Sequence, residues 1–107
     1  MMNLRSQIQT GWPNQITLHQ TISAYVRYDR VTGFKIGITN NPQARAANYG
    51  GAYDEMIVLY QTNSDKNVRE MEYILTQYYR DVPDNINDGG GGPKGAGPYY
   101  LYIVLRR

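Results

Sequence analysis

Residues 22–45 read ISAYVRYDRVTGFKIGITNNPQAR, and this stretch decides the fold that the sequence predicts. Apolar and polar residues alternate within it at 22–28 and again at 34–39, a pattern that is typical of half-buried strands. A short segment that contains glycine separates the two runs, which favours a hairpin. We therefore expect two antiparallel strands whose apolar residues share one face of a sheet.

The opposite face of this expected hairpin carries the polar residues. Matching the apolar faces places Tyr25 directly across from Lys35, with about 5 Å between their Cβ atoms. Arg27, Gly37 and Thr39 lie on the same face. A phenol beside an ammonium, next to a glycine that leaves room, could hold an anion. Taken alone, however, Tyr25 could equally be a cross-strand packing residue, and Lys35 could be a solvated surface residue.

A short helix is predicted directly after the second run. Asn41 is a suitable N-cap, and Pro42 fits the first helical position. The helix should cover residues 43–49, where a pair of glycines ends it. Arg45 and Tyr49 are four residues apart and therefore share one face of this helix.

Two further elements follow. Residues 56–60 form a continuous apolar run, which indicates a central strand covered on both sides. Residues 63–80 predict a second helix, on which Glu72 falls within about 60° of the centre of the apolar stripe and Glu70 lies about 140° away. Glu72 should therefore face the interior or its edge, where a carboxylate needs a cation, a metal or hydrogen bonds. The apolar stripe comprises Val68, Met71, Leu75, Tyr78 and Tyr79.

The two ends of the chain are less informative. Residues 1–21 are weakly patterned, with a possible short strand at 16–18, and we expect a peripheral arm. Residues 22–107 should form one domain, which includes a glycine-rich loop at 88–98 and a last strand at 99–105.

Composition excludes several classes of protein. A chain of 107 residues forms one domain, and the absence of cysteine excludes disulfide scaffolds, thiolate zinc sites, iron–sulfur clusters and cysteine catalysis. The single histidine, His19, excludes a multi-histidine metal site, and we expect it to be solvated and without a catalytic role. The 11 tyrosines, beside one phenylalanine and one tryptophan, predict a polar environment near the core or around a site.

The same composition predicts an intracellular protein, in the cytoplasm or with the nucleoid or nucleus. No apolar run approaches the roughly 20 residues of a membrane span, and the first residues lack the apolar core of a secretory signal. The net charge of +2 argues against dense electrostatic coating of a nucleic acid by this chain alone.

Several of these features together match the spacing of one enzyme family. The matching parts are Ser23-Ala24-Tyr25, Lys35-Ile36-Gly37 with Ile38-Thr39, Arg45, Tyr49, and the glutamate of Met71-Glu72-Tyr73-Ile74-Leu75. With this spacing the chain resembles the GIY-YIG nuclease superfamily over about residues 22–87. Only the tyrosine of the first tripeptide matches, and Lys35 stands where most members have a tyrosine.

The resemblance implies a fold and an activity. The fold is α+β, with a small three- to four-stranded, mainly antiparallel sheet flanked by helices. The activity is endonucleolytic hydrolysis of phosphodiester bonds in DNA, assisted by one Mg²⁺ or Mn²⁺ ion. Such a chain would bind DNA, with no membrane partner, and would gain targeting from an attached domain or from dimerisation.

The resemblance also implies a role for each residue. Glu72 would be the only protein ligand of the metal, as suits a cation that keeps its waters. Arg45 would clamp the scissile phosphate, and Tyr25 would be the general base, with Lys35 favouring its phenolate. Tyr49 would position the water or the phosphate. Further substrate contacts are expected from Arg27, Thr39, Asn87 and Lys94.

Other interpretations of the same residues stay open. Lys35 could preserve the function of the tyrosine that it replaces, or it could mark a lost base. Glu72 could be neutralised by Arg45 or Lys35 in a structural ion pair without a metal. The chain could then be a non-catalytic module that binds nucleic acid or protein. A homodimer could form through residues 99–102, if that strand is an exposed edge.

Overall fold

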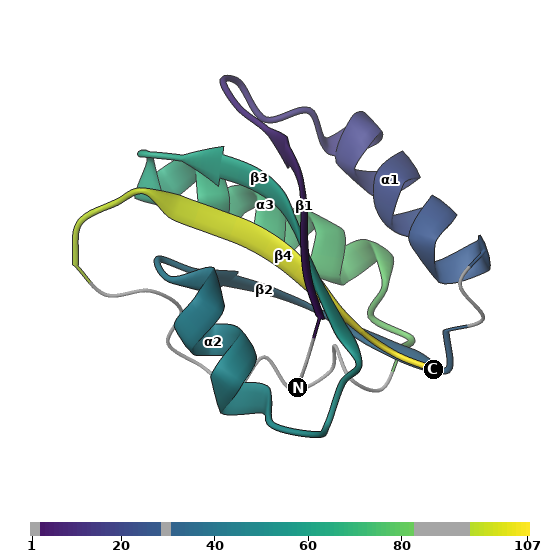
Figure 1. The fold of residues 1–107 in the computed structure, drawn as a ribbon. Coiled ribbons are helices and arrows are strands. Elements are labelled where there is room, and N and C mark those ends of the chain that lie inside the picture. The colour runs from purple at the N-terminus through teal and green to yellow at the C-terminus, as the bar shows by residue number, and fades with distance from the viewer. Residues whose placement is uncertain (1–2, 29–30, 83–94) are drawn as a thin grey trace.

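The computed structural model describes residues 3–28, 31–82 and 95–107. The protein has the predicted α+β fold, in which helices flank a mainly antiparallel sheet (Figure 1). Its elements, in chain order, are β1 (Asn3–Gln9), α1 (Gln15–Tyr28), β2 (Gly33–Thr39), α2 (Pro42–Tyr49), β3 (Glu55–Thr62), α3 (Asp65–Tyr78) and β4 (Tyr99–Arg106).

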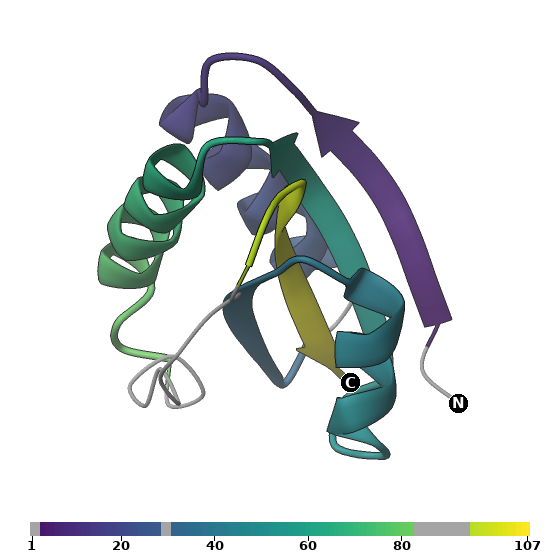
Figure 2. The same ribbon diagram turned by 90° about the vertical axis from the view of Figure 1, so that its left-hand side faces the viewer.

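The sheet separates two unequal layers. Its four strands lie in the order β1-β3-β4-β2, with β1 parallel to β3 and the other neighbours antiparallel. Helices α1 and α3 cover one face, and α2 covers part of the other, as Figure 2 shows from the side. We call these the α1/α3 face and the α2 face. The larger core lies under α1 and α3, whereas the smaller apolar cluster on the α2 face comprises Ala46, Met56, Val58, Tyr102 and Val104.

The predicted hairpin is wrong, because residues 22–28 lie within helix α1. The pattern also fits a helix once Leu18 is considered: Leu18 and Ile22 are fully buried and Val26 packs against the core, a spacing of four residues. Ala24, which the strand pattern placed inward, is exposed. The helical stripe therefore explains the burial better than the alternation does.

The strand that pairs with β2 comes from the other end of the chain. In the antiparallel β2–β4 ladder, Lys35 is opposite Val104 and Gly37 is opposite Tyr102. The expected strands at 56–60 and 99–105 are confirmed as β3 and β4. Because β4 lies between β3 and β2, it is not an edge, and the proposed dimer contact through residues 99–102 is wrong.

Residues 3–21 are part of the sheet and its cover. They form β1 and the first half of α1, so the boundary expected at residue 22 falls inside a helix. The short strand expected at 16–18 is also helical, and Leu18 within it is fully buried. These residues extend the sheet through the parallel pairing of β1 with β3 and add Leu18 to the core.

Both ends of α2 are as predicted. The Asn41 side chain accepts a hydrogen bond from the Ala44 N–H at 3.1 Å, and Gly50 ends α2 with a φ of +58°. In α3, Val68, Met71 and Leu75 are buried as expected. Tyr78 is 57% exposed, contrary to the prediction, and its ring lies at the rim against His19.

No helix within the described ranges is long and apolar enough to cross a membrane.

Candidate functional site

A pair of tyrosines lies at the centre of the α2 face. The hydroxyl oxygens of Tyr102, on β4, and Tyr49, at the end of α2, share a hydrogen bond of 2.7 Å. Their rings meet edge to face, with centroids 6.2 Å apart. Tyr102 is only 2% exposed, whereas Tyr49 is partly exposed. Tyr49 is therefore the phenol of the pair that a ligand can reach.

Gly37 makes room for this pair. It lies opposite Tyr102 in the β2–β4 ladder, and a Cβ added there would overlap the Tyr102 hydroxyl. A glycine is required at this position by space rather than by an unusual backbone conformation. The glycine of Lys35-Ile36-Gly37 thus determines where the buried phenol lies.

Charges of both signs lie close to the phenols. Burial raises the pKa of Tyr102 far above its ordinary value, and the hydrogen bond to Tyr49 and the charge of Glu72 act in the same direction. Burial also raises the pKa of Tyr49, and Glu72 adds to this effect. The hydrogen bond from Tyr102 and the charge of Arg45 lower the pKa of Tyr49 but do not overcome its burial. Both phenols therefore remain protonated at neutral pH.

The electrostatic coupling brings together three of the residues singled out in the sequence. The charges of Arg45 and Glu72 each influence both Tyr49 and Tyr102, so the four side chains lie within electrostatic range of one another. Arg45 and Tyr49 come from one face of α2, and Glu72 comes from the half-buried flank of α3. Glu70, two residues before Glu72, is exposed as predicted.

Lys35 and Thr39 lie on the same face as the two phenols. Lys35 is partly exposed and sits diagonally across the ladder from Tyr102, within reach of a long side chain. Thr39 is buried, and its hydroxyl accepts a hydrogen bond from the Asn41 N–H at 3.0 Å. Thr39 therefore holds the start of α2, contrary to the expected contact with substrate.

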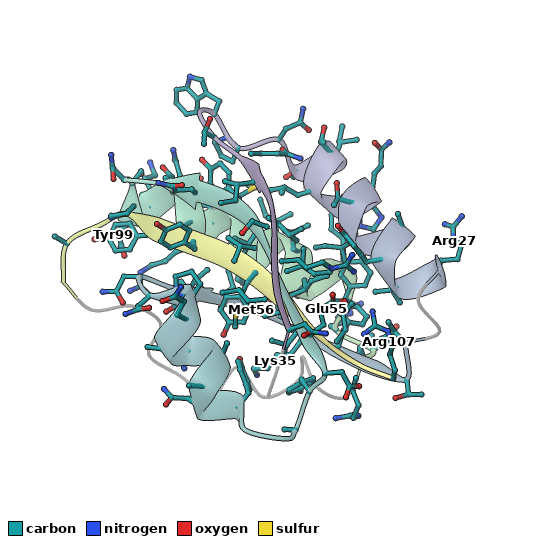
Figure 3. All side chains as sticks on the ribbon, in the orientation of Figure 1. Arg27, Lys35, Glu55, Met56, Tyr99 and Arg107 are labelled. Atoms are coloured by element: carbon teal, nitrogen blue, oxygen red, sulfur yellow. The ribbon has the colours of Figure 1, made fainter. Side chains whose placement is uncertain are left out.

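The expected general base, Tyr25, lies elsewhere. It belongs to α1 and packs against the core of the α1/α3 face, with the Arg5 guanidinium 5.6 Å from its ring centre. Tyr25 packs with the core of the α1/α3 face and Tyr49 with the cluster on the α2 face, so the structure does not place Tyr25 beside Tyr49. In the sheet, Lys35 lies opposite Val104 and not opposite Tyr25. Arg27 is exposed and projects from the end of α1, away from α2 (Figure 3), so its assignment to the site is also wrong. Asn87 and Lys94 lie outside the described residues.

Among the described residues that act on the two phenols, Glu72 is the carboxylate. Within the described residues, no three His, Cys, Asp or Glu side chains are grouped. A single carboxylate such as that of Glu72 fits the donor chemistry of Mg²⁺ or Mn²⁺, because such hard cations are often held by one carboxylate together with water and phosphate oxygens.

Tyr102 is the residue that the sequence prediction missed. The signal for it was present, since strand 99–105 is rich in tyrosine and Gly37 leaves a gap between Lys35 and Thr39 on the polar face of its strand. What could not be recognised was the pairing of these two segments, which are more than 60 residues apart in the chain. Comparison of the chain with protein-family models, with curated proteins and with solved structures gave no match.

Proposed function

We propose that this chain is a metal-dependent endonuclease domain that hydrolyses phosphodiester bonds in DNA. The observation that carries the proposal is the hydrogen-bonded pair of Tyr49 and Tyr102, on which the charges of Arg45 and Glu72 act from α2 and α3. An arginine for a phosphate, a reachable phenol for water and an acid for a cation are the groups that this hydrolysis uses.

The pairing of β2 with β4 supports a modified form of the GIY-YIG resemblance. The resemblance placed a tyrosine-bearing strand beside Lys35-Ile36-Gly37, and β4, with Tyr102, occupies that place. The phenol first assigned to Tyr25 is then supplied from the C-terminal end of the chain. In this proposal the tyrosine-bearing strand keeps its place beside Lys35-Ile36-Gly37 in the sheet, but it follows these residues in the sequence instead of preceding them.

The residues have distinct roles in the proposed reaction. Arg45 binds the scissile phosphate and the charge that develops on it. Water adds to phosphorus and the bond to the leaving oxygen breaks; the phenolate of Tyr49 takes the water proton, and the leaving oxygen takes a proton from solvent. Tyr102 is a positioning residue, because it is buried and acts through its hydrogen bond to Tyr49.

Two further residues complete the proposed site. Glu72 would hold Mg²⁺ or Mn²⁺, which, when bound, polarises the phosphate and stabilises charge on the leaving oxygen. Lys35 offers a second cation on the same face, in the position where it can contact a neighbouring phosphate.

Nicking of supercoiled plasmid with Mg²⁺ or Mn²⁺ tests the proposal. We expect the parent chain to nick, and Glu72→Ala and Arg45→Ala to lose this activity. Glu70→Ala is the matched control, because Glu70 is an exposed acid on the same helix. Cleavage that is unaffected by Glu72→Ala would overturn the assignment of the site.

A non-catalytic DNA-binding module on the same fold is the second candidate. The observation that favours it is the raised pKa of both tyrosines, since protonated phenols donate hydrogen bonds and are poor bases. DNA binding that weakens in Arg45→Ala, with no nicking at any pH or with either metal, would support this function over the first.

A further inference from the structure

The exposed apolar side chains of the described residues gather near the N-terminus. Four of the six exposed large hydrophobic residues lie between residues 4 and 16. They are Leu4, Ile8, Trp12 and Ile16, and Trp12 is 88% exposed. These residues belong to β1, the following turn and the start of α1, and the turn joins the two elements at the top of the molecule (Figure 1).

The turn that carries Trp12 is held in a defined conformation. Gly11 has a φ of +82°, and its carbonyl accepts a hydrogen bond of 2.6 Å from the hydroxyl of buried Tyr60. On the other side, the Asn14 side chain accepts a hydrogen bond from the Thr17 N–H at 3.0 Å and caps α1. The apolar surface is therefore presented by an ordered segment rather than by a loose arm.

The charge pattern of this region favours a protein partner over a nucleic acid. The sequence contains no Asp, Glu, Lys or Arg between Arg5 and Arg27. Arg5 itself forms a salt bridge with Glu55. Surfaces that bind nucleic acid need positive charge, whereas the centres of protein interfaces are poor in charge and rich in tryptophan.

Strand β1 gives this surface an edge that another strand can pair with. Within the described part of the chain, β1 pairs on one side only, with β3. The opposite edge strand, β2, is buried at every position except Lys35, whereas most of β1 is exposed. An exposed edge strand of seven residues is a site for strand addition.

The sequence of β1 is complementary to itself in one antiparallel register. With Ser6 on the two-fold axis, Leu4 faces the partner's Ile8, and Ser6 faces its own copy. Arg5 falls opposite position 7, so the pairing does not bring like charges together. The register of β1 with β3 shifts between Ser6 and Gln9, yet Leu4, Ser6 and Ile8 still line one groove of about 390 Å³ on the α2 face.

We propose that β1 is the dimerisation strand of this protein and that its occupant is a second copy of the chain. Antiparallel pairing of the two β1 strands joins the two sheets into one, with a two-fold axis at Ser6. Leu4 and Ile8 then pack against the partner's Ile8 and Leu4 across the axis. This inference does not depend on the proposed nuclease activity.

Disulfide formation in a chain without native cysteine tests the register directly. In an antiparallel pair the Cα atoms of the two Ser6 residues would be about 4.5–5.5 Å apart, within the range that a disulfide spans. We expect Ser6→Cys to form a covalent dimer under mild oxidation. Gln20→Cys, which is exposed on α1, should stay mostly monomeric in a denaturing gel.

Sedimentation of the full chain over a range of concentrations supplies the second test. We expect the parent to dimerise and Ser6→Lys to weaken the dimer about tenfold or more, because two like charges then face each other. Gln20→Lys is the control, and thermal unfolding should show that both variants fold. A strict monomer, with no preference for the Ser6→Cys disulfide, would overturn the proposal, as would a dimer unaffected by Ser6→Lys.

Discussion

The ring of Tyr102 occupies the space that a side chain at Gly37 would need. The two residues face each other in the β2–β4 ladder, and the Tyr102 hydroxyl then continues to the hydroxyl of Tyr49. The position of the Tyr49 phenol on α2 thus depends on Gly37 of β2, through the Tyr102 ring of β4. This relation connects the packing of the sheet to the proposed chemistry.

Gly37→Ala should therefore disturb both stability and activity. The added methyl must displace the Tyr102 ring, which breaks its hydrogen bond to Tyr49. We expect a loss of about 1–3 kcal/mol in the free energy of unfolding. Plasmid nicking should fall in parallel, and thermal unfolding measures the first effect.

Gly51→Ala is the control for this substitution. No atom lies within 4 Å of a Cβ added at Gly51. We expect that variant to unfold and to nick as the parent does. A Gly37→Ala variant with parental stability and activity would show that the position of Tyr102 has no influence on the site.

Three tyrosine-to-phenylalanine variants separate the proposed site from the one that the sequence first indicated. Tyr49→Phe should reduce nicking about 100-fold or more, because it removes the hydroxyl whose phenolate takes the water proton. Tyr102→Phe should have a smaller effect and should shift the pH profile to higher pH, since its hydrogen bond lowers the pKa of Tyr49. Tyr25→Phe should leave nicking unchanged, because Tyr25 lies on the other face.

The pH profile of nicking tests the role of Tyr49 in another way. Burial raises the pKa of Tyr49 above its ordinary value of 10, so the phenolate is a minor species at neutral pH. If the phenolate is the base, the rate rises about tenfold per pH unit below that pKa. Initial rates at pH 7 to 9, with saturating Mg²⁺, should show this slope, and a plateau below pH 8 would contradict it.

Local features of the fold could be predicted from the sequence. The cap at Asn41 and the stop at Gly50 are short-range signals, and they placed α2 correctly. The four-residue step from Arg45 to Tyr49 and the angular position of Glu72 followed from helical geometry alone. These signals depend on neighbours within one or two turns, which is why they survived in the folded chain.

The pairing of distant segments could not be predicted in the same way. Residues 22–28 alternate in polarity, but the burial of Leu18 one turn earlier favours a helix, and only the folded core decides between the two. The partner of β2 then had to come from beyond residue 98, a choice that no local pattern indicates. Tyr25 was assigned to the site from this wrong pairing and from the match of its spacing to the GIY-YIG family.

Glu55 provides a test of stability that is independent of function. It is 5% exposed and accepts hydrogen bonds of 3.0 Å from Arg5 and 2.8 Å from Arg107, which joins β1 and the C-terminus to β3 (Figure 3). Burial alone would raise the pKa of Glu55, but the hydrogen bonds and charges of the two arginines outweigh it and lower the pKa. The carboxylate is therefore more favourable in the folded chain than in the unfolded one.

Glu55→Gln should lower the free energy of unfolding at pH 7 by about 1.5–3 kcal/mol, the usual contribution of hydrogen bonds to charged groups. The pKa of Glu55 in the folded chain lies below the ordinary value of 4.5, so the parent loses this advantage as the pH falls through the lowered pKa. In acid, the parent and Glu55→Gln should therefore have similar free energies of unfolding. Asp65→Asn is the control, since its salt bridge with Arg69 is exposed and should contribute little. Urea unfolding from pH 7 to pH 3 measures the difference in free energy of unfolding between the parent and Glu55→Gln. A difference that stays constant over this range would mean that packing, rather than the charge of Glu55, stabilises this end of the sheet.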